Sequence, residues 1–282
     1  MTEVSLDELG LDAQTPSSLS AEHSIRIGAA IDAPHSFTDG DALPFLWHWA
    51  HFAPLTPTTD LGVDGHPKLP GGITSNYPRR MWASGTIEAP GQLVVGKSAT
   101  RHSRVVEAKE SSGRSGALLI VTVEHRYRQF GVDQIIEDQT LVYRTPSDPV
   151  RLPAGNVQPE LKSGQWLERH VPGPVSLFRF SAITFNAHRI HYDHPYATSV
   201  EGYPDLVVHG PLVALRVGQA IGNHSRRRLG RFQFRGNAPL FVNLPFTIVG
   251  ETTGDDVSAK VIRNDGTEAM TVKAMLTPAD KG

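Results

Sequence analysis

The chain has 282 residues, of which 39% are hydrophobic, so it can bury one large core or two modest ones. Its 27 basic and 29 acidic residues nearly cancel, which leaves no basic field for a nucleic-acid backbone. The chain has no cysteine, so disulfides, thiolate zinc sites and cysteine nucleophiles are excluded.

The N-terminal segment is acidic and lacks the basic and apolar regions of a secretory signal. No apolar run approaches the roughly 18 residues that a membrane-spanning helix needs. We therefore expect a cytoplasmic protein that binds neither nucleic acid nor a membrane.

The first part of the chain predicts a tail followed by an antiparallel sheet. Residues 1–24 are polar and predict a flexible tail or a short helix. Residues 43–52 carry aromatic side chains spaced for one face of a short buried helix. The stretch 53–80 is rich in proline and glycine and predicts a long loop, of the kind that forms lids or binding loops. From 81 to 143, β-branched runs separated by turn signals predict strands.

A polar, proline-bearing linker over residues 149–174 is predicted to join two halves, 25–148 and 175–282. In the second half, residues 211–221 predict a helix, with Pro211 near its first turn and a glycine after its end. Strands are predicted after this helix at 231–235, 240–251, 257–263 and 270–276, with a strong turn signal at 264–266.

The second half also contains a cluster of polar residues within an otherwise apolar segment. Asn186, His188, His191 and Asp193 lie within eight positions, and His209-Gly210 precedes the predicted helix. If the chain is extended there, His191 and Asp193 face the same side, and a carboxylate beside a histidine supports proton transfer near neutrality. Gly210 at a helix N-terminus would offer a backbone N–H and the positive end of the helix dipole to an oxyanion.

Two other interpretations apply to the same residues. A histidine that precedes a helix often serves as a cap or a surface residue rather than as a catalyst. His188, His191, Asp193 and His194 are all metal-ligand types, but neither HExxH spacing nor a thiolate cluster supports a metal site. We therefore expect no metal.

The pattern resembles the MaoC-like, R-specific enoyl-CoA hydratases, whose motif is Asp-x-Asn-Pro-x-His-x-Asp followed by a later His-Gly pair. The closer resemblance is to a subgroup whose motif runs as residues 185–193 do here, Phe-Asn-Ala-His-Arg-Ile-His-Tyr-Asp, with His209-Gly210 downstream. That subgroup contains itaconyl- and mesaconyl-CoA hydratases and 3-hydroxyacyl-thioester dehydratases. Segments 79–85 and 113–116 of the first half are similar to its N-terminal dehydratase-like domain.

The resemblance implies an α+β double hot-dog fold, in which two antiparallel sheets are each wrapped around a helix. It implies no cofactor, a catalytic role for His191 and an oxyanion role for Gly210, with His209 beside it. Asn186 stands where the family has its catalytic aspartate and cannot act as a Brønsted acid or base. We predict that Asp193 supplies the carboxylate and that Asn186 positions water.

The function that follows is hydration of an α,β-unsaturated acyl thioester, or the reverse dehydration, on CoA or acyl-carrier protein. A short branched or dicarboxylic acyl group would need a cation for its free carboxylate, and Arg79, Arg80 and Arg189 are the candidates. Alternatively, Arg79 and Arg80 are two solvent-exposed loop residues without a role in binding.

Two alternative functions remain. One is a 3-hydroxyacyl dehydratase of fatty-acid synthesis that acts on linear chains. The other is an acyl-thioester-binding protein without activity. The first half shows no comparable Asn/His cluster, so we expect it to shape the pocket rather than to catalyse. Association into a homo-oligomer is a further expectation.

Overall fold

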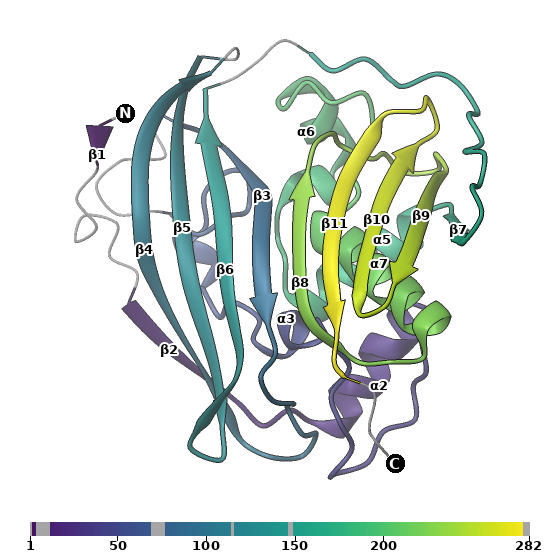
Figure 1. Ribbon diagram of the computed structural model, residues 1–282. Helices are drawn as coiled ribbons and strands as arrows, with labels where there is room; N and C mark the ends of the chain where they lie inside the picture. Colours follow the sequence, from purple (N-terminus) through teal and green to yellow (C-terminus); the bar gives the residue numbers. More distant parts are fainter. Residues whose placement is uncertain (1, 4–11, 69–76, 114–115, 146–148, 279–282) are drawn as a thin grey trace.

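The computed structural model describes residues 2–3, 12–68, 77–113, 116–145 and 149–278 (Figure 1). Its strands are β1 (Thr2–Glu3), β2 (Asp12–Ser17), β3 (Arg79–Glu88), β4 (Ala99–Gly113), β5 (Gly116–Gln129), β6 (Val132–Arg144), β7 (Gln165–His170), β8 (Leu229–Gly236), β9 (Phe246–Thr253), β10 (Asp256–Arg263) and β11 (Glu268–Leu276). Its helices are α2 (Ala21–Ala30), α3 (His48–His51), α5 (Pro174–Thr184), α6 (His194–Ser199) and α7 (Gly210–Ser225), with single 3₁₀ turns η1 (Thr58–Asp60) and η3 (Arg189–His191).

The strands form one continuous antiparallel sheet of 11 strands. Its order is β1-β4-β5-β6-β3-β8-β11-β10-β9-β7, and β2 pairs with β4. The strands of the two halves of the chain meet where β3 pairs with β8, in a register that sets Gly85 opposite Phe234. Within the strands, burial alternates along the chain, as in β5, where Leu119, Val121 and Val123 are buried and their neighbours are less so.

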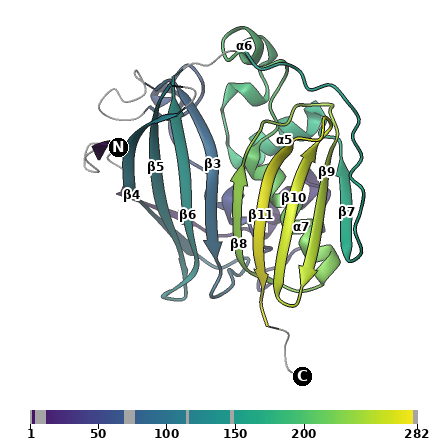
Figure 2. The same ribbon diagram turned by 45° about the horizontal axis from the view of Figure 1, so that its top comes forward.

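The helices lie on one side of the sheet, and α5 and α7 lie behind β8–β11 in both views (Figures 1 and 2). Pro in its first turn favours the start of α7, and Arg226 ends it in the left-handed conformation. Because α7 packs against the sheet, its apolar side chains from Leu212 to Ile221 are buried in the main core. The helices α2 and α3 of the first half are shorter than α7, with ten and four residues against sixteen.

The predicted α+β hot-dog class is confirmed, as are the helix after Pro211 and the turn at 264–266. The two separate sheets that were predicted are instead one sheet, because β3 and β8 pair across the halves. The segment 1–24 was predicted to be a flexible tail or a short helix. Residues 12–17 instead form β2, which pairs with β4, and the helix α2 begins at Ala21. The segment 149–174 is not only a linker, since β7 lies within it and pairs with β9. The boundaries of the two hot-dog halves stay a prediction.

Part of the predicted loop 53–80, residues 69–76, lies outside the described residues, as do two residues of the turn cluster at 110–116. None of the helices in the described ranges is long and apolar enough to cross a membrane.

Gly85 provides a test of the β3–β8 junction. A Cβ on Gly85 would lie 2.6 Å from the ring of Phe234, and that ring is buried and stacked on Trp82 with centroids 4.0 Å apart. Because the ring cannot move away freely, we expect Gly85→Ala to lower the free energy of unfolding by about 1–3 kcal/mol, measured by urea titration.

Gly222→Ala is the matched control. Gly222 lies near the end of α7, and an added Cβ there meets nothing within 4 Å. The same substitution should therefore be neutral or stabilise by about 0.5–1 kcal/mol, as it does in a helix. Equal effects of the two substitutions would contradict the packing argument.

Candidate active site

A cavity of about 1210 Å³ runs between the two halves and is lined by residues of both. The second half contributes Asn186, His188, Arg189, His191 and Gly210. The first half contributes residues from the loop before β3 and from strands β3 to β6, among them His66, Arg80, Trp82, His125 and Tyr127. The cavity therefore contains most of the residues predicted for the site, together with several that were not predicted.

His191 is held in one tautomer at the end of η3. Its Nδ1 lies 2.7 Å from the carbonyl oxygen of Val207, and since a carbonyl only accepts, Nδ1 carries the hydrogen. Nε2 then keeps a lone pair, as a general base requires. Burial lowers the pKa of His191 to about 4, so the ring is neutral at pH 7.

His209 packs behind His191, at the N-cap of α7. The two rings stack with centroids 3.7 Å apart, and His209 Nε2 bonds to the Ser181 hydroxyl at 2.9 Å. His209 is fully buried and is not among the residues that line the cavity, so it is placed to orient His191 rather than to bind substrate. Burial, with His191 beside it, holds the pKa of His209 well below its ordinary value.

Gly210 begins α7 and faces the cavity. A Cβ at this position would lie 2.6 Å from the ring of Trp82 on β3, so the close approach of the two halves requires glycine. Among the described residues nothing accepts a hydrogen bond from its N–H. This free donor at a helix N-terminus can receive an oxyanion.

Asn186 follows the left-handed residue that ends α5 and also lines the cavity. Its Oδ1 accepts a hydrogen bond of 2.9 Å from the backbone N–H of His188, which fixes the turn that carries the histidines. The side-chain NH₂ group remains available, and its role in positioning water stays a prediction.

Asp193 does not lie where a catalytic carboxylate was predicted. Residues 189–191 form a 3₁₀ turn rather than extended chain, so the alternation that set Asp193 beside His191 does not apply. Asp193 caps α6 by accepting from the Tyr196 N–H at 3.1 Å, and Arg189 donates to it at 2.7 and 2.9 Å. It is not among the cavity-lining residues, and these contacts give it a structural role.

The three candidate arginines differ in whether an acidic side chain already binds them. Arg79 pairs with the carboxylate of Glu201 at 2.6 Å and donates to the carbonyl of Val200. Arg189 is held by Asp193 and by the carbonyl of Val63. Arg80 lines the cavity, and no described group forms a hydrogen bond or ion pair with its guanidinium.

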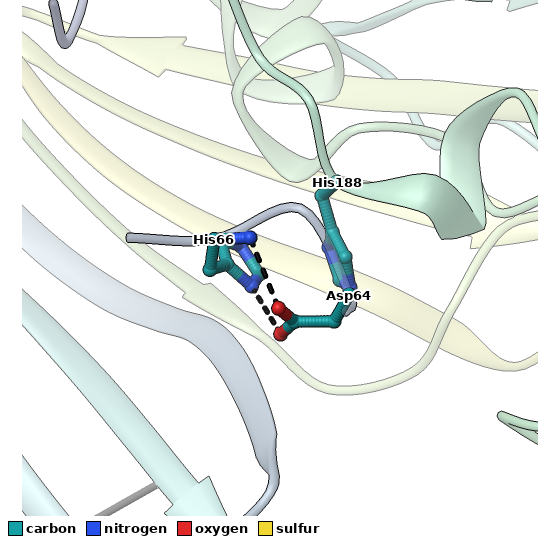
Figure 3. Close-up of side chains that lie close together, drawn as sticks. All are labelled: Asp64, His66 and His188. Atoms are coloured by element: carbon teal, nitrogen blue, oxygen red, sulfur yellow. Dashed lines mark hydrogen bonds and ion pairs between the residues drawn. The ribbon is translucent and has the colours of Figure 1, made fainter. Parts of the chain in front are cut away.

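Asp64 and His66 were not predicted from the sequence, and a loop of the first half brings them to His188 of the second half (Figure 3). The ring of His66 lies 4.0 Å from that of His188, which in turn meets His191 edge-on at 5.3 Å. No pattern could have linked them, because more than a hundred residues separate the two segments.

The first half also contains a buried polar cluster that the sequence analysis did not predict. Glu137, fully buried on β6, accepts hydrogen bonds from Trp49 and Tyr127 at 3.0 Å and contacts His48 at 3.3 Å. Burial alone would raise the pKa of Glu137, but the bond with His48 and the nearby His125 lower it to about 2. Trp49, Tyr127 and His125 line the cavity, whereas Glu137 and His48 are not among its lining residues, so this cluster supports the cavity wall from behind.

Asp64, His66 and His188 each bring one potential metal-ligand atom within 4.8 Å of the others. However, Asp64 already accepts a hydrogen bond from His66 Nδ1 at 2.9 Å. Its other oxygen accepts from the His66 backbone N–H at 3.0 Å, so both carboxylate oxygens already take part in hydrogen bonds to His66. The arrangement favours a hydrogen-bonded pair, and the absence of a metal stays a prediction.

The fold and the site together define a hot-dog enzyme that adds or removes water at an acyl thioester. Residues 46–242 match the hydroxyacyl-thioester dehydratase type 2 family, and the chain belongs to this family of hydro-lyases.

Curated relatives agree with the family match. The chain is 39% identical to mesaconyl-C(4)-CoA hydratase of Chloroflexus aurantiacus, over 95% of this chain and 96% of the relative. It is 27% identical to the mitochondrial hydroxyacyl-thioester dehydratase type 2 of Schizosaccharomyces pombe, over 74% of this chain and 78% of the relative. Among solved structures, a MaoC-like dehydratase from Phytophthora capsici shares the fold, with a TM-score of 0.71, 13% identity and coverage of 97% and 98%.

His191 and Asp193 provide a contrast that tests the assignment of the site. We expect His191→Ala to lower kcat by about 10²–10⁴, because it removes the Nε2 lone pair that faces the cavity and can accept a hydrogen bond from the attacking water. Asp193→Ala should instead lower the free energy of unfolding by about 0.5–2 kcal/mol through loss of the α6 cap. Steady-state rates and urea titrations measure both. An equal loss of kcat in Asp193→Ala would show that the Asp193 carboxylate takes part in catalysis.

The buried histidines predict how stability depends on pH. Burial lowers the pKa to about 3 for His51 and to about 4 for His125 and His191. Between pH 6.5 and about 4 the unfolded chain binds these protons and the folded chain does not, so stability falls as pH falls. Each group contributes up to about 1.4 kcal/mol per pH unit in this window.

Urea titrations at pH 7.5, 6 and 5 measure this dependence. The unfolding midpoint should fall steadily with pH, and His125→Gln should reduce the slope. A midpoint that stays constant down to pH 5 would contradict the assignment of neutral buried rings.

Proposed function

We propose that this chain hydrates a short dicarboxylic enoyl-CoA of the mesaconyl type. The observation that carries the proposal is Arg80, a guanidinium that faces the same cavity as His191 and Gly210 and has no partner among the described residues. The relative named mesaconyl-C(4)-CoA hydratase, which matches along almost its entire length, supports the same substrate class.

The proposed reaction depends on how the site binds the thioester carbonyl and the attacking water. The thioester carbonyl would accept a hydrogen bond from the Gly210 N–H, where the α7 dipole stabilises the negative charge of an enolate. This polarisation makes the β-carbon electrophilic. The attacking water would donate a hydrogen bond to His191 Nε2, whose lone pair is free because Nδ1 is bonded to Val207. A proton then passes from that water to the α-carbon, and dehydration is the reverse.

The free carboxylate of the acyl group needs a cation, since burying an unpaired charge is costly. Arg79 and Arg189 each already hold an acidic side chain, so their charge is satisfied within the protein. Arg80 is the candidate that remains, and a guanidinium binds a carboxylate with two parallel hydrogen bonds.

A second candidate function is the dehydration of linear 3-hydroxyacyl thioesters. The cavity volume of about 1210 Å³ favours it, because a five-carbon acyl group fills only a small part of that space. The remaining space suits either a longer chain or the arm of the carrier. Use of CoA rather than acyl-carrier protein, assembly into a homo-oligomer and a cytoplasmic location stay predictions.

Hydration rates on mesaconyl-, itaconyl- and crotonyl-CoA separate the candidates, and Arg80→Gln tests the proposed cation. We expect the wild type to prefer a dicarboxylic substrate. Arg80→Gln should raise KM for that substrate at least about tenfold, the equivalent of one ion pair. The KM for crotonyl-CoA should stay within about threefold of the wild-type value. Arg231→Gln is the control, since Arg231 lies half exposed beside Glu88. A wild-type preference for crotonyl-CoA would favour the linear-chain function instead.

A further inference from the structure

We propose that Asp64 and His66 form the acid–base pair of the hydration site, a role that the Asn186 amide cannot take, while His191 orients the attacking water. His66 is the catalytic residue of this pair and Asp64 its positioning residue. The inference rests on the proposed function, because it assigns the proton that this reaction must move.

The loop that carries the pair is fixed to the second-half motif. The N–H of Arg189 donates to the Asp64 carbonyl at 2.9 Å, and the Arg189 guanidinium donates to the Val63 carbonyl at 3.0 Å. Between them, Gly65 has φ +90° and approaches Ala187 so closely that a Cβ would overlap the Ala187 carbonyl. Arg189 therefore ties the first-half loop to the turn that presents His188 and His191.

Within the loop, Asp64 sets the tautomer of His66. One carboxylate oxygen accepts from the backbone N–H of His66 at 3.0 Å, and the other lies 2.9 Å from Nδ1 (Figure 3). A carboxylate only accepts, so Nδ1 carries the hydrogen and Nε2 has the lone pair. His66 lines the cavity and its ring packs on His188, one ring away from His191.

The two neutral histidines differ in what they face. Protonated His191 would have a carbonyl and a buried imidazole as its neighbours. Burial and the nearby Arg80 lower the pKa of His66, but protonated His66 would be paired with the Asp64 carboxylate through Nδ1, which stabilises the imidazolium. Of the two, His66 is therefore the better place for the proton that leaves water, and His191 is the better acceptor to orient that water.

The resulting step balances. The water oxygen bonds to the β-carbon while one of its protons passes to His66 Nε2, and the electrons of the double bond move onto the thioester oxygen at Gly210. His66 then gives this proton to the α-carbon, the carbonyl re-forms, and His66 is neutral again. Asn186, whose amide cannot exchange a proton, is left to hold the turn.

The first experiment compares kcat of His66→Gln and Asp64→Asn with wild type, on whichever thioester of the panel the wild type hydrates. We expect kcat to fall by about 10²–10⁴ in His66→Gln. In Asp64→Asn it should fall less, with KM within about threefold and the acid limb of the kcat–pH profile moved to lower pH. Asp64→Glu should recover part of the loss.

The controls are matched in chemistry and lie outside the cavity lining. His194→Gln removes an exposed histidine that pairs with Asp205, and Asp60→Asn removes a carboxylate of the same loop region. Both should keep wild-type kcat. Near-normal kcat in His66→Gln, or loss of activity on chelation with EDTA, would overturn the proposal. Wild type that hydrates none of the panel would count against the proposed function instead.

A second measurement needs no substrate. Nitrogen-15 NMR of the His66 ring in the intact chain should show hydrogen on Nδ1 and a free Nε2, and this preference should weaken in Asp64→Asn. Hydrogen on Nε2 in the wild type would overturn the pair whatever the substrate proves to be.

Discussion

The pairing of β3 with β8 is the contact on which the cavity and the site both depend. It joins the strands of the two halves into one sheet and sets Trp82 of β3 against Phe234 of β8 and against Gly210 at the start of α7. The same strand, β3, carries Arg80 into the cavity. The cavity is thus formed between the halves, and neither half alone contains the full set of groups that line it.

The chemistry depends on keeping imidazoles neutral and oriented in a buried place. Burial disfavours the charged form of His191 and His209, while a carbonyl and a hydroxyl hold their rings. In His191 one ring nitrogen donates to a carbonyl, so the lone pair of the other nitrogen is free to accept a hydrogen bond at neutral pH. Of the three candidate arginines, Arg79 is paired with Glu201 and Arg189 with Asp193, which leaves Arg80 without a partner among the described residues.

Asn186 explains why the site draws on both halves. An amide at this position can hold the backbone N–H of His188 but cannot exchange a proton. The carboxylate of Asp64, which lies close to His66 and His188, comes from the opposite half, on a loop anchored by Arg189. Asp193, the neighbour in sequence, is committed to capping α6.

The sequence by itself determined the class of fold, the position of α7, and the placing of His191 and Gly210 in the site. Strand alternation, helix-end signals and the motif 185–193 are local patterns, so they can be recognised in the sequence without knowledge of the fold. Only the tertiary structure decided the rest. It turned Asp193 away through a 3₁₀ turn, paired Arg79 and Arg189, and brought Asp64 and His66 from the first half to His188. These outcomes depend on contacts between segments far apart in the chain, which no local pattern records.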